Sequence, residues 1–215
     1  MPTTGAEVAA RERLAAVSLC AITPDRDPAR VVELASAYLR AGVAMVQLRH
    51  KSLARGELLS LALRLVALVR AAGALLVVND HLDVALAAGA DGVHLGAEDI
   101  SVPAARRVGG PAFLIGASAA DPEAARRAVA EGADYLGAGP AFPTPVKASK
   151  PPIGPAGVAA VARAVDVPVF AIGGVDAGRL PELLEVGVAR VCVIRALADD
   201  PHPEAAAARL LALLG

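Results

Sequence analysis

AGADGV, residues 88–93, has close counterparts in AGVAMV (41–46), EGADYL (131–136) and VGVARV (186–191). In each of them a glycine follows an amphipathic segment and leads into an aliphatic run. This order is typical of a helix that ends at glycine and turns directly into a strand. Because parallel strands need a helical crossover, the recurrence of this turn predicts βα units and a parallel sheet.

Eight aliphatic runs are candidate strands: 17–23, 44–48, 74–79, 91–95, 113–118, 134–139, 168–173 and 190–194. Helix-like segments between them include 29–42, 57–73, 83–90, 122–133, 154–165 and 180–188. We therefore expect an α/β fold, a single-domain (β/α)8 TIM barrel over residues 1–215, with 1–16 as an N-terminal extension or helix. An open doubly wound sheet is the main rival, but the first turn, ITPDRDP (22–28), contains no GxGxxG motif.

Composition argues against several functional classes. A formal net charge of -1 without a basic tract argues against nucleic-acid binding. The most apolar stretch, 58–78, is interrupted by Arg64 and Arg70, so we expect no membrane span and no membrane partner. Cys20 and Cys192 each lie in an apolar run, which predicts buried free thiols and a cytoplasmic protein. The sequence is also compatible with a homo-oligomer.

Polar residues gather where the predicted strands end, and active sites of such barrels lie at that end. They are Gln47, Arg49, Lys51, Asn79, Asp80, Asp99, Ser118, Thr144, Lys147, Gly173 and Gly174. In MVQLRHK (45–51), strand alternation would place Gln47, Arg49 and Lys51 on one face. Arginine and lysine side chains suit phosphate oxygens, so the cations at this rim predict a polyanionic ligand.

Two further features of the rim refine this prediction. Asp80 and Asp99 would end neighbouring strands, and Mg²⁺ commonly binds one or two carboxylates together with phosphate oxygens and water. Gly173 and Gly174 follow the seventh strand, where many barrels bind phosphate through backbone amides. Two anion sites, one of them with a metal, indicate an enzyme that joins two phosphorylated substrates.

Each of these features also has a purely structural interpretation. Asn79 and Asp80 could form a turn or helix cap, and Gly173 with Gly174 a tight turn. His94 is expected to be a packed or supporting histidine, and His50 would point away from Gln47. The functional interpretation is favoured because the polar set falls at one end of successive strands.

Five segments carry a resemblance: QLRHK (47–51), NDHLDVALAAGADGVHLGAED (79–99), IGAS (115–118), ADYLGAGPAFPTPVK (133–147) and PVFAIGGV (168–175). In this order and spacing they resemble the thiamine phosphate synthase family and its relatives, the thiazole tautomerases. The resemblance extends from about residue 17 to residue 197. It implies a (β/α)8 barrel that joins hydroxymethylpyrimidine diphosphate to thiazole phosphate with Mg²⁺ as cofactor.

The resemblance also implies roles for individual residues. Contacts to the pyrimidine diphosphate would come from Gln47, Arg49, Lys51, Asn79, Ser118 and Lys147, of which Lys147, Ser118 and Arg49 are the predicted catalytic residues. Asp80 and Asp99 would bind Mg²⁺. Gly174 and Ile194 would hold the thiazole phosphate, and Thr144 would lie in the loop on the thiazole side. Gly173 is predicted as a further contact from its place after the seventh strand. The implied reaction ionises the C–O bond to diphosphate, and the thiazole nitrogen captures the pyrimidine cation without a protein nucleophile.

Several positions depart from the family pattern. Val146 replaces the second hydroxyl of a PTxTK-like loop, Ala97 stands where glutamine is common, and His81 where arginine is common. Arg195 stands where the family often has serine, and we hypothesise that it adds a charge-assisted contact to the thiazole phosphate.

Three alternatives stay open on the sequence alone. Thiazole tautomerases use a histidine shortly after the fifth-strand serine, where this chain has Ala119 and Ala120. A non-catalytic thiazole phosphate binder is compatible with Val146 and Arg195, although the cations and both carboxylates are retained. Another phosphate-sugar barrel enzyme, such as an epimerase, would need paired acid and base residues that this rim does not offer.

Overall fold

The computed structural model describes residues 5–144 and 151–215. Within these residues eight parallel strands pair in chain order, and the last pairs with the first, so the barrel is closed. The predicted (β/α)8 TIM barrel is confirmed. The strands are β1 (Leu19–Ile22), β2 (Met45–Leu48), β3 (Leu75–Asn79), β4 (Gly92–Leu95), β5 (Leu114–Ala119), β6 (Tyr135–Ala138), β7 (Val169–Ile172) and β8 (Val191–Val193).

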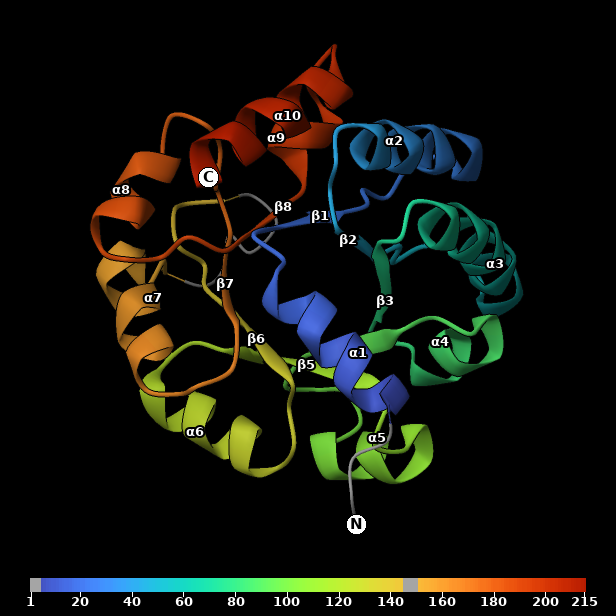
Figure 1. The fold of residues 1–215 in the computed structure, drawn as a ribbon, viewed down its shortest axis with the longest axis horizontal. Coiled ribbons are helices and arrows are strands. Elements are labelled where there is room, and N and C mark those ends of the chain that lie inside the picture. The colour runs from blue at the N-terminus through green and yellow to red at the C-terminus, as the bar shows by residue number, and fades with distance from the viewer. Residues whose placement is uncertain (1–4, 145–150) are drawn as a thin grey trace.

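Helices surround the barrel, and α1 lies across one of its ends (Figure 1). Their bounds are α1 (Gly5–Ala15), α2 (Pro28–Arg40), α3 (Arg55–Ala71), α4 (Leu82–Ala88), α5 (Val102–Gly109), α6 (Pro122–Ala130), α7 (Gly154–Arg163), α8 (Leu180–Glu185), α9 (Arg195–Ala198) and α10 (Pro203–Leu214). No helix among the described residues is both long and apolar enough to cross a membrane.

The repeated glycine turn has the geometry that its sequence predicts. Gly42, Gly89, Gly132 and Gly187 all have positive φ, between 69° and 103°. The next residue donates its backbone N–H to a carbonyl five residues earlier, as in Ala90 to Ala85 (2.9 Å) and Val188 to Leu183 (2.9 Å). This pattern is the Schellman motif, which ends a helix and aims the chain at the next strand.

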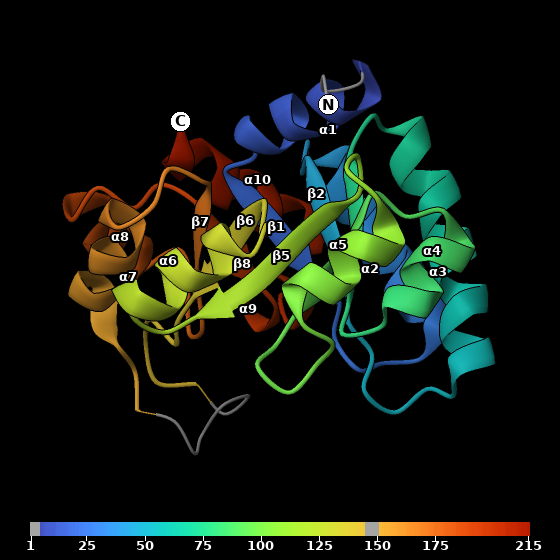
Figure 2. The ribbon, with the colours of Figure 1, turned by 90° about the horizontal axis from the view of Figure 1, so that it is seen from below.

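The barrel interior contains a second apolar cluster, separate from the layer between strands and helices. Its members are Leu14, Val17, Cys20, Ile22, Met45, Leu75, Val77, Leu114, Tyr135, Phe170 and Cys192. Leu14 and Val17 enter from α1 and the turn after it, and Arg13 donates to the carbonyl of Ala74 just before β3 (2.6 Å). Helix α1 therefore closes the end of the barrel where the strands begin (Figure 2).

Cys20 and Cys192 face each other across β1 and β8. Both are buried free thiols, as predicted. A hydrogen bond with Cys192 and burial in the barrel raise the pKa of the Cys20 thiol. These cysteines therefore behave as small apolar side chains that fill the interior of the barrel.

Candidate functional site

The end of β2 presents cations to the barrel mouth. Strand β2 ends at Leu48, so the predicted alternation of side chains between the two faces of the strand applies only as far as Gln47. Arg49 and Lys51 lie in the loop after the strand. The Arg49 side chain is only 17% exposed, and its Nη1 lies 3.0 Å from Oδ2 of Asp25. The Lys51 side chain is 60% exposed, and its Nζ lies 3.7 Å from Oδ2 of Asp80. Arg49 is therefore held in place by its counter-ion, whereas the Lys51 ammonium group is exposed to an approaching ligand.

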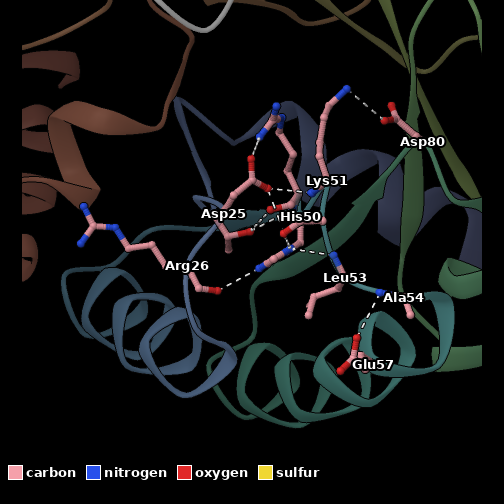
Figure 3. A network of polar contacts seen from close by, with 11 residues as sticks. Asp25, Arg26, His50, Lys51, Leu53, Ala54, Glu57 and Asp80 are labelled. Carbon is pink, nitrogen blue, oxygen red and sulfur yellow. Dashed lines mark hydrogen bonds and ion pairs between the residues drawn. The ribbon is translucent and has the colours of Figure 1, made fainter.

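Asp25 is a residue of this site that the sequence reasoning missed. It lies in the loop after β1, and its Oδ1 accepts the backbone N–H of Lys51 at 2.7 Å (Figure 3). Burial alone would raise the pKa of Asp25, but this hydrogen bond and the charge of Arg49 outweigh it and lower the pKa overall. The available signal was the turn ITPDRDP (22–28), in which two aspartates follow β1.

His50 packs against the loop after β1. It is 7% exposed, and its Nε2 lies 2.8 Å from the backbone oxygen of Arg26. Its imidazole is directed at the backbone of the loop after β1 (Figure 3). This geometry agrees with the structural role expected for His50.

The structure brings the two predicted metal ligands together. Asp80 has a positive φ of 65° and donates its backbone N–H to the carbonyl of His94 (2.8 Å), which fixes it at the end of β3. Burial, then a hydrogen bond and repulsion from Asp99, raise the pKa of Asp80, while the charge of Lys51 opposes the shift. The Oδ2 atom of Asp99 also accepts the backbone N–H of Gly96 at 2.7 Å.

Two adjoining carboxyl groups are a suitable donor set for a hard divalent cation. Among the described residues no group of three or more His, Cys, Asp or Glu side chains could hold a metal. A cation bound here would therefore need oxygens from water or from a ligand. That arrangement is the one Mg²⁺ uses with phosphorylated substrates. Asn79, half-buried at the end of β3, borders the same place.

A chain of polar side chains connects the barrel interior to the mouth. Nε2 of His94 lies 3.1 Å from the Ser118 hydroxyl, and its Nδ1 lies 3.2 Å from the Tyr135 hydroxyl. Burial raises the pKa of the Tyr135 hydroxyl, and the side chain of Gln47, which is 3% exposed, opposes this shift through a hydrogen bond. The expectation that His94 is a packed, supporting histidine agrees with this arrangement, since it positions Ser118, which is exposed at the mouth.

The opposite side of the mouth holds a cavity of about 410 Å³. The predicted residues Thr144, Gly173, Gly174, Ile194 and Arg195 all line it. Gly173 and Gly174 have φ values of 97° and 66°. A Cβ atom on Gly174 would lie 2.8 Å from the carbonyl oxygen of Pro143, so only glycine fits this approach of two loops.

Arg179 is a second residue that the sequence reasoning missed. It lines the cavity, and its Nη1 donates to the carbonyl oxygen of Gly174 at 2.9 Å. Its guanidinium lies 5.4 Å from the centre of the Phe142 ring. The sequence offered only an arginine in GGVDAGRL (173–180), five residues beyond the glycine that it supports.

Arg195 and its counter-ion form another wall of the cavity. Nε of Arg195 lies 3.0 Å from Oδ2 of Asp199, and both residues line the cavity. The Arg195 side chain is 59% exposed, so a bound anion could reach it. Lys147 and Val146 lie outside the described residues, and their predicted roles stay predictions.

Known proteins match most of this chain. The profile of the family described as "Thiamine monophosphate synthase" matches residues 19–197. This chain belongs to that family.

Individual members of the family are similar to most of this chain. The thiamine-phosphate synthase of Gloeobacter violaceus is 43% identical over 193 residues, which are 89% of this chain and 56% of that protein. The thiamine-phosphate synthase of Mycobacterium sp. strain KMS is 45% identical over 196 residues, 86% of each chain. The structure of thiamine phosphate pyrophosphorylase from Pyrococcus furiosus is similar with a TM-score of 0.85 and 35% identity, covering 95% of this chain and 96% of that one. The chain thus spans about half of the first relative and most of the second.

Proposed function

We propose that this barrel is a thiamine-phosphate synthase, a transferase for the pyrimidinylmethyl group. It joins 4-amino-2-methyl-5-hydroxymethylpyrimidine diphosphate to 4-methyl-5-(2-phosphoethyl)thiazole and releases diphosphate. The observation that carries the proposal is the layout of the mouth. Carboxylates and cations lie at the ends of β2, β3 and the loop after β4, and a glycine-lined cavity lies at the ends of β6, β7 and β8.

Asp80 and Asp99 would hold Mg²⁺ in this proposal. When bound, the metal neutralises negative charge on the diphosphate leaving group. The paired carboxyl groups support the assignment, because burying two acids side by side is unfavourable unless a proton or a cation lies between them.

Arg49, Lys51, Asn79 and Lys147 would bind the diphosphate, and Gln47 and Ser118 would orient the pyrimidine. Breakage of the methylene C–O bond sends its electron pair to the diphosphate, whose growing charge the cations stabilise. The thiazole nitrogen then supplies the electron pair of the new C–N bond. The protein contributes alignment and charge stabilisation, so none of its side chains needs to act as a nucleophile.

The cavity would hold the thiazole phosphate. The backbone at Gly173 and Gly174 can approach a phosphate closely, and Thr144, Ile194 and Arg195 border the same space. Both ligands would then be phosphorylated small molecules. We also expect a cytoplasmic location, in keeping with the free thiols of Cys20 and Cys192.

Product analysis tests the proposed function. Purified protein is incubated with both substrates, with Mg²⁺ or with EDTA, and thiamine phosphate is quantified by chromatography. The proposal expects product that depends on Mg²⁺. Absence of product from folded protein that still binds thiazole phosphate would instead favour a tautomerase-like protein or a non-catalytic binder.

Arg195 provides a prediction on the thiazole side. Arg195→Ala is expected to raise the KM for thiazole phosphate about tenfold, because a charge-assisted hydrogen bond is lost. The KM for the pyrimidine diphosphate should stay within about twofold of wild type. Steady-state kinetics with each substrate varied in turn measure both values.

Arg209→Ala is the matched control, since Arg209 is similarly exposed (56%) and also pairs with an aspartate, Asp200, at 2.7 Å. It does not line the cavity. Equal thiazole phosphate KM values for Arg195→Ala and Arg209→Ala would contradict the role of Arg195.

A further inference from the structure

The loop between β1 and α2 makes ion pairs in two directions from two consecutive residues. Asp25 pairs with Arg49, at 3.0 Å, on the side of the mouth that carries the cations. Arg26 pairs through Nη2 with Oδ1 of Asp199, at 2.7 Å, on the side of the cavity. One short loop therefore contacts both halves of the candidate site.

The contact of Arg26 continues into the cavity through Asp199. The two oxygens of Asp199 are divided between two arginines, Oδ1 to Arg26 and Oδ2 to Arg195. Since Arg195 and Asp199 both line the cavity, Arg26 fixes the carboxylate that orients the Arg195 guanidinium. The bond from Arg26 is made by a single nitrogen, so an ammonium group could replace it.

The contact of Asp25 continues to the other half. Its Oδ2 holds the Arg49 side chain and its Oδ1 holds the backbone N–H of Lys51. The hydroxyl of Thr23 accepts the backbone N–H of Arg49 (2.9 Å) and donates to the carbonyl oxygen of the same residue (2.9 Å). Hydrogen bonds and an ion pair therefore connect the loop after β2 to the segment after β1 at several points.

The backbone of this loop is held at Arg26, and the next residue, Asp27, serves helix α2 instead. The carbonyl oxygen of Arg26 lies 2.8 Å from His50 Nε2, and Figure 3 shows this contact beside the one between Asp25 and Lys51. The Asp27 carboxylate accepts the backbone N–H of Ala29 at 2.8 Å and caps α2. Asp25 and Arg26 thus project from a backbone that other residues hold, and their side chains are available for positioning.

We propose that Asp25 and Arg26 are positioning residues for different substrates. Asp25 orients Arg49 and the Lys51 backbone for the diphosphate, and Arg26, acting through Asp199, orients Arg195 for the phosphate in the cavity. The assignment of ligands rests on the proposed function. Adjacent residues of one loop would then control the two affinities separately, which a purely structural role for the loop would not produce.

Calorimetric titration with two probes tests this proposal without turnover. The probes are inorganic diphosphate with Mg²⁺ and 4-methyl-5-(2-phosphoethyl)thiazole. Asp25→Asn, which still accepts the Lys51 N–H, is expected to weaken diphosphate binding about tenfold and thiazole phosphate binding less than about twofold. Arg26→Ala is expected to weaken thiazole phosphate binding about fivefold and diphosphate binding less than about twofold.

Two more variants separate positioning from structure. Arg26→Lys should restore most of the thiazole phosphate affinity, because an ammonium can replace the single bond to Asp199. Asp27→Ala removes the cap of α2, so it should lower the melting temperature while leaving both affinities unchanged.

Weakening of both ligands to the same degree by Asp25→Asn or Arg26→Ala would overturn the proposal, and so would no weakening by either. Loss of either affinity in Asp27→Ala would overturn it as well. Wild-type protein that binds both probes but forms no product would refute the proposed function while leaving the positioning roles to be decided by the titrations.

Discussion

Replacing Asp80 by asparagine is expected to lower the rate of thiamine phosphate formation about 10²- to 10³-fold, measured at saturating substrates and Mg²⁺. The change removes one of two adjoining carboxylates from the proposed metal site. Asparagine is the suitable replacement because Asp80 has a φ of 65°, a region that asparagine adopts more readily than most residues. Kinetic assays over a range of Mg²⁺ concentrations measure the effect.

Protein stability distinguishes this loss from misfolding. Because burial and Asp99 raise the pKa of Asp80, the folded protein carries an unfavourable charge there at neutral pH when no metal is bound. Without metal, Asp80→Asn should therefore melt at the wild-type temperature or above it. Asp83→Asn is the control, because Asp83 is 67% exposed and pairs with Arg55, so this change removes a carboxylate that is paired with a cation. A wild-type rate and Mg²⁺ dependence in Asp80→Asn would refute the metal assignment.

Gly116→Ala is expected to lower the free energy of unfolding by about 3 kcal/mol. A Cβ atom on Gly116 would overlap the ring of Tyr135 inside the barrel. Tyr135 is 1% exposed, packs edge-on against Phe170 with 5.8 Å between ring centroids, and contacts His94, so it cannot move aside. Thermal unfolding should show a melting temperature lowered by about 5–10 °C.

The same substitution should also reduce turnover, since displacement of Tyr135 would disturb His94 and the Ser118 hydroxyl. Gly56→Ala is the matched control. A Cβ atom on Gly56, in α3, would have no neighbour within 4 Å, so the variant should be unchanged or stabilised by up to about 1 kcal/mol. Equal melting temperatures for wild type and Gly116→Ala would show that the interior is not packed as described.

The barrel could be predicted because its signals are local. Gly89 and its counterparts end helices through bonds that reach only five residues back, so each turn is encoded in about six adjacent positions. The structure shows that Gly73 ends α3 in the same way, with a φ of 68° and a bond from Ala74 to Val69 (3.0 Å). The sequence of that turn, AAGALL (71–76), is less similar to the four repeated turns than these are to one another.

The rim could be predicted in outline because strand ends meet at one edge of a parallel barrel. Asp80 and Asp99 belong to neighbouring βα units, so their proximity follows from the fold. The long-range ion pairs do not follow from it. Arg26 and Asp199 are 173 positions apart, and nothing near either residue in the sequence specifies the other.

The interior network escaped prediction for another physical reason. Whether His94 reaches Tyr135 and Ser118 depends on which interior positions lack a side chain. Gly137 leaves room for the His94 ring, since a Cβ atom there would lie 3.2 Å from Cε1 of His94. Gly116 does the same for Tyr135. The space left by such a glycine can be assigned to a neighbouring side chain only when the register of the strands is known.

The most direct test of the account is the stoichiometry of the reaction catalysed by the purified protein. Thiamine phosphate and released diphosphate are both quantified after incubation with the two substrates and Mg²⁺. We predict one diphosphate for each thiamine phosphate, with both products absent when EDTA replaces Mg²⁺. Thiamine phosphate formed at the same rate in EDTA, or no product from protein that binds both substrates, would contradict the central claim that this barrel end is a metal-assisted site joining two phosphorylated molecules.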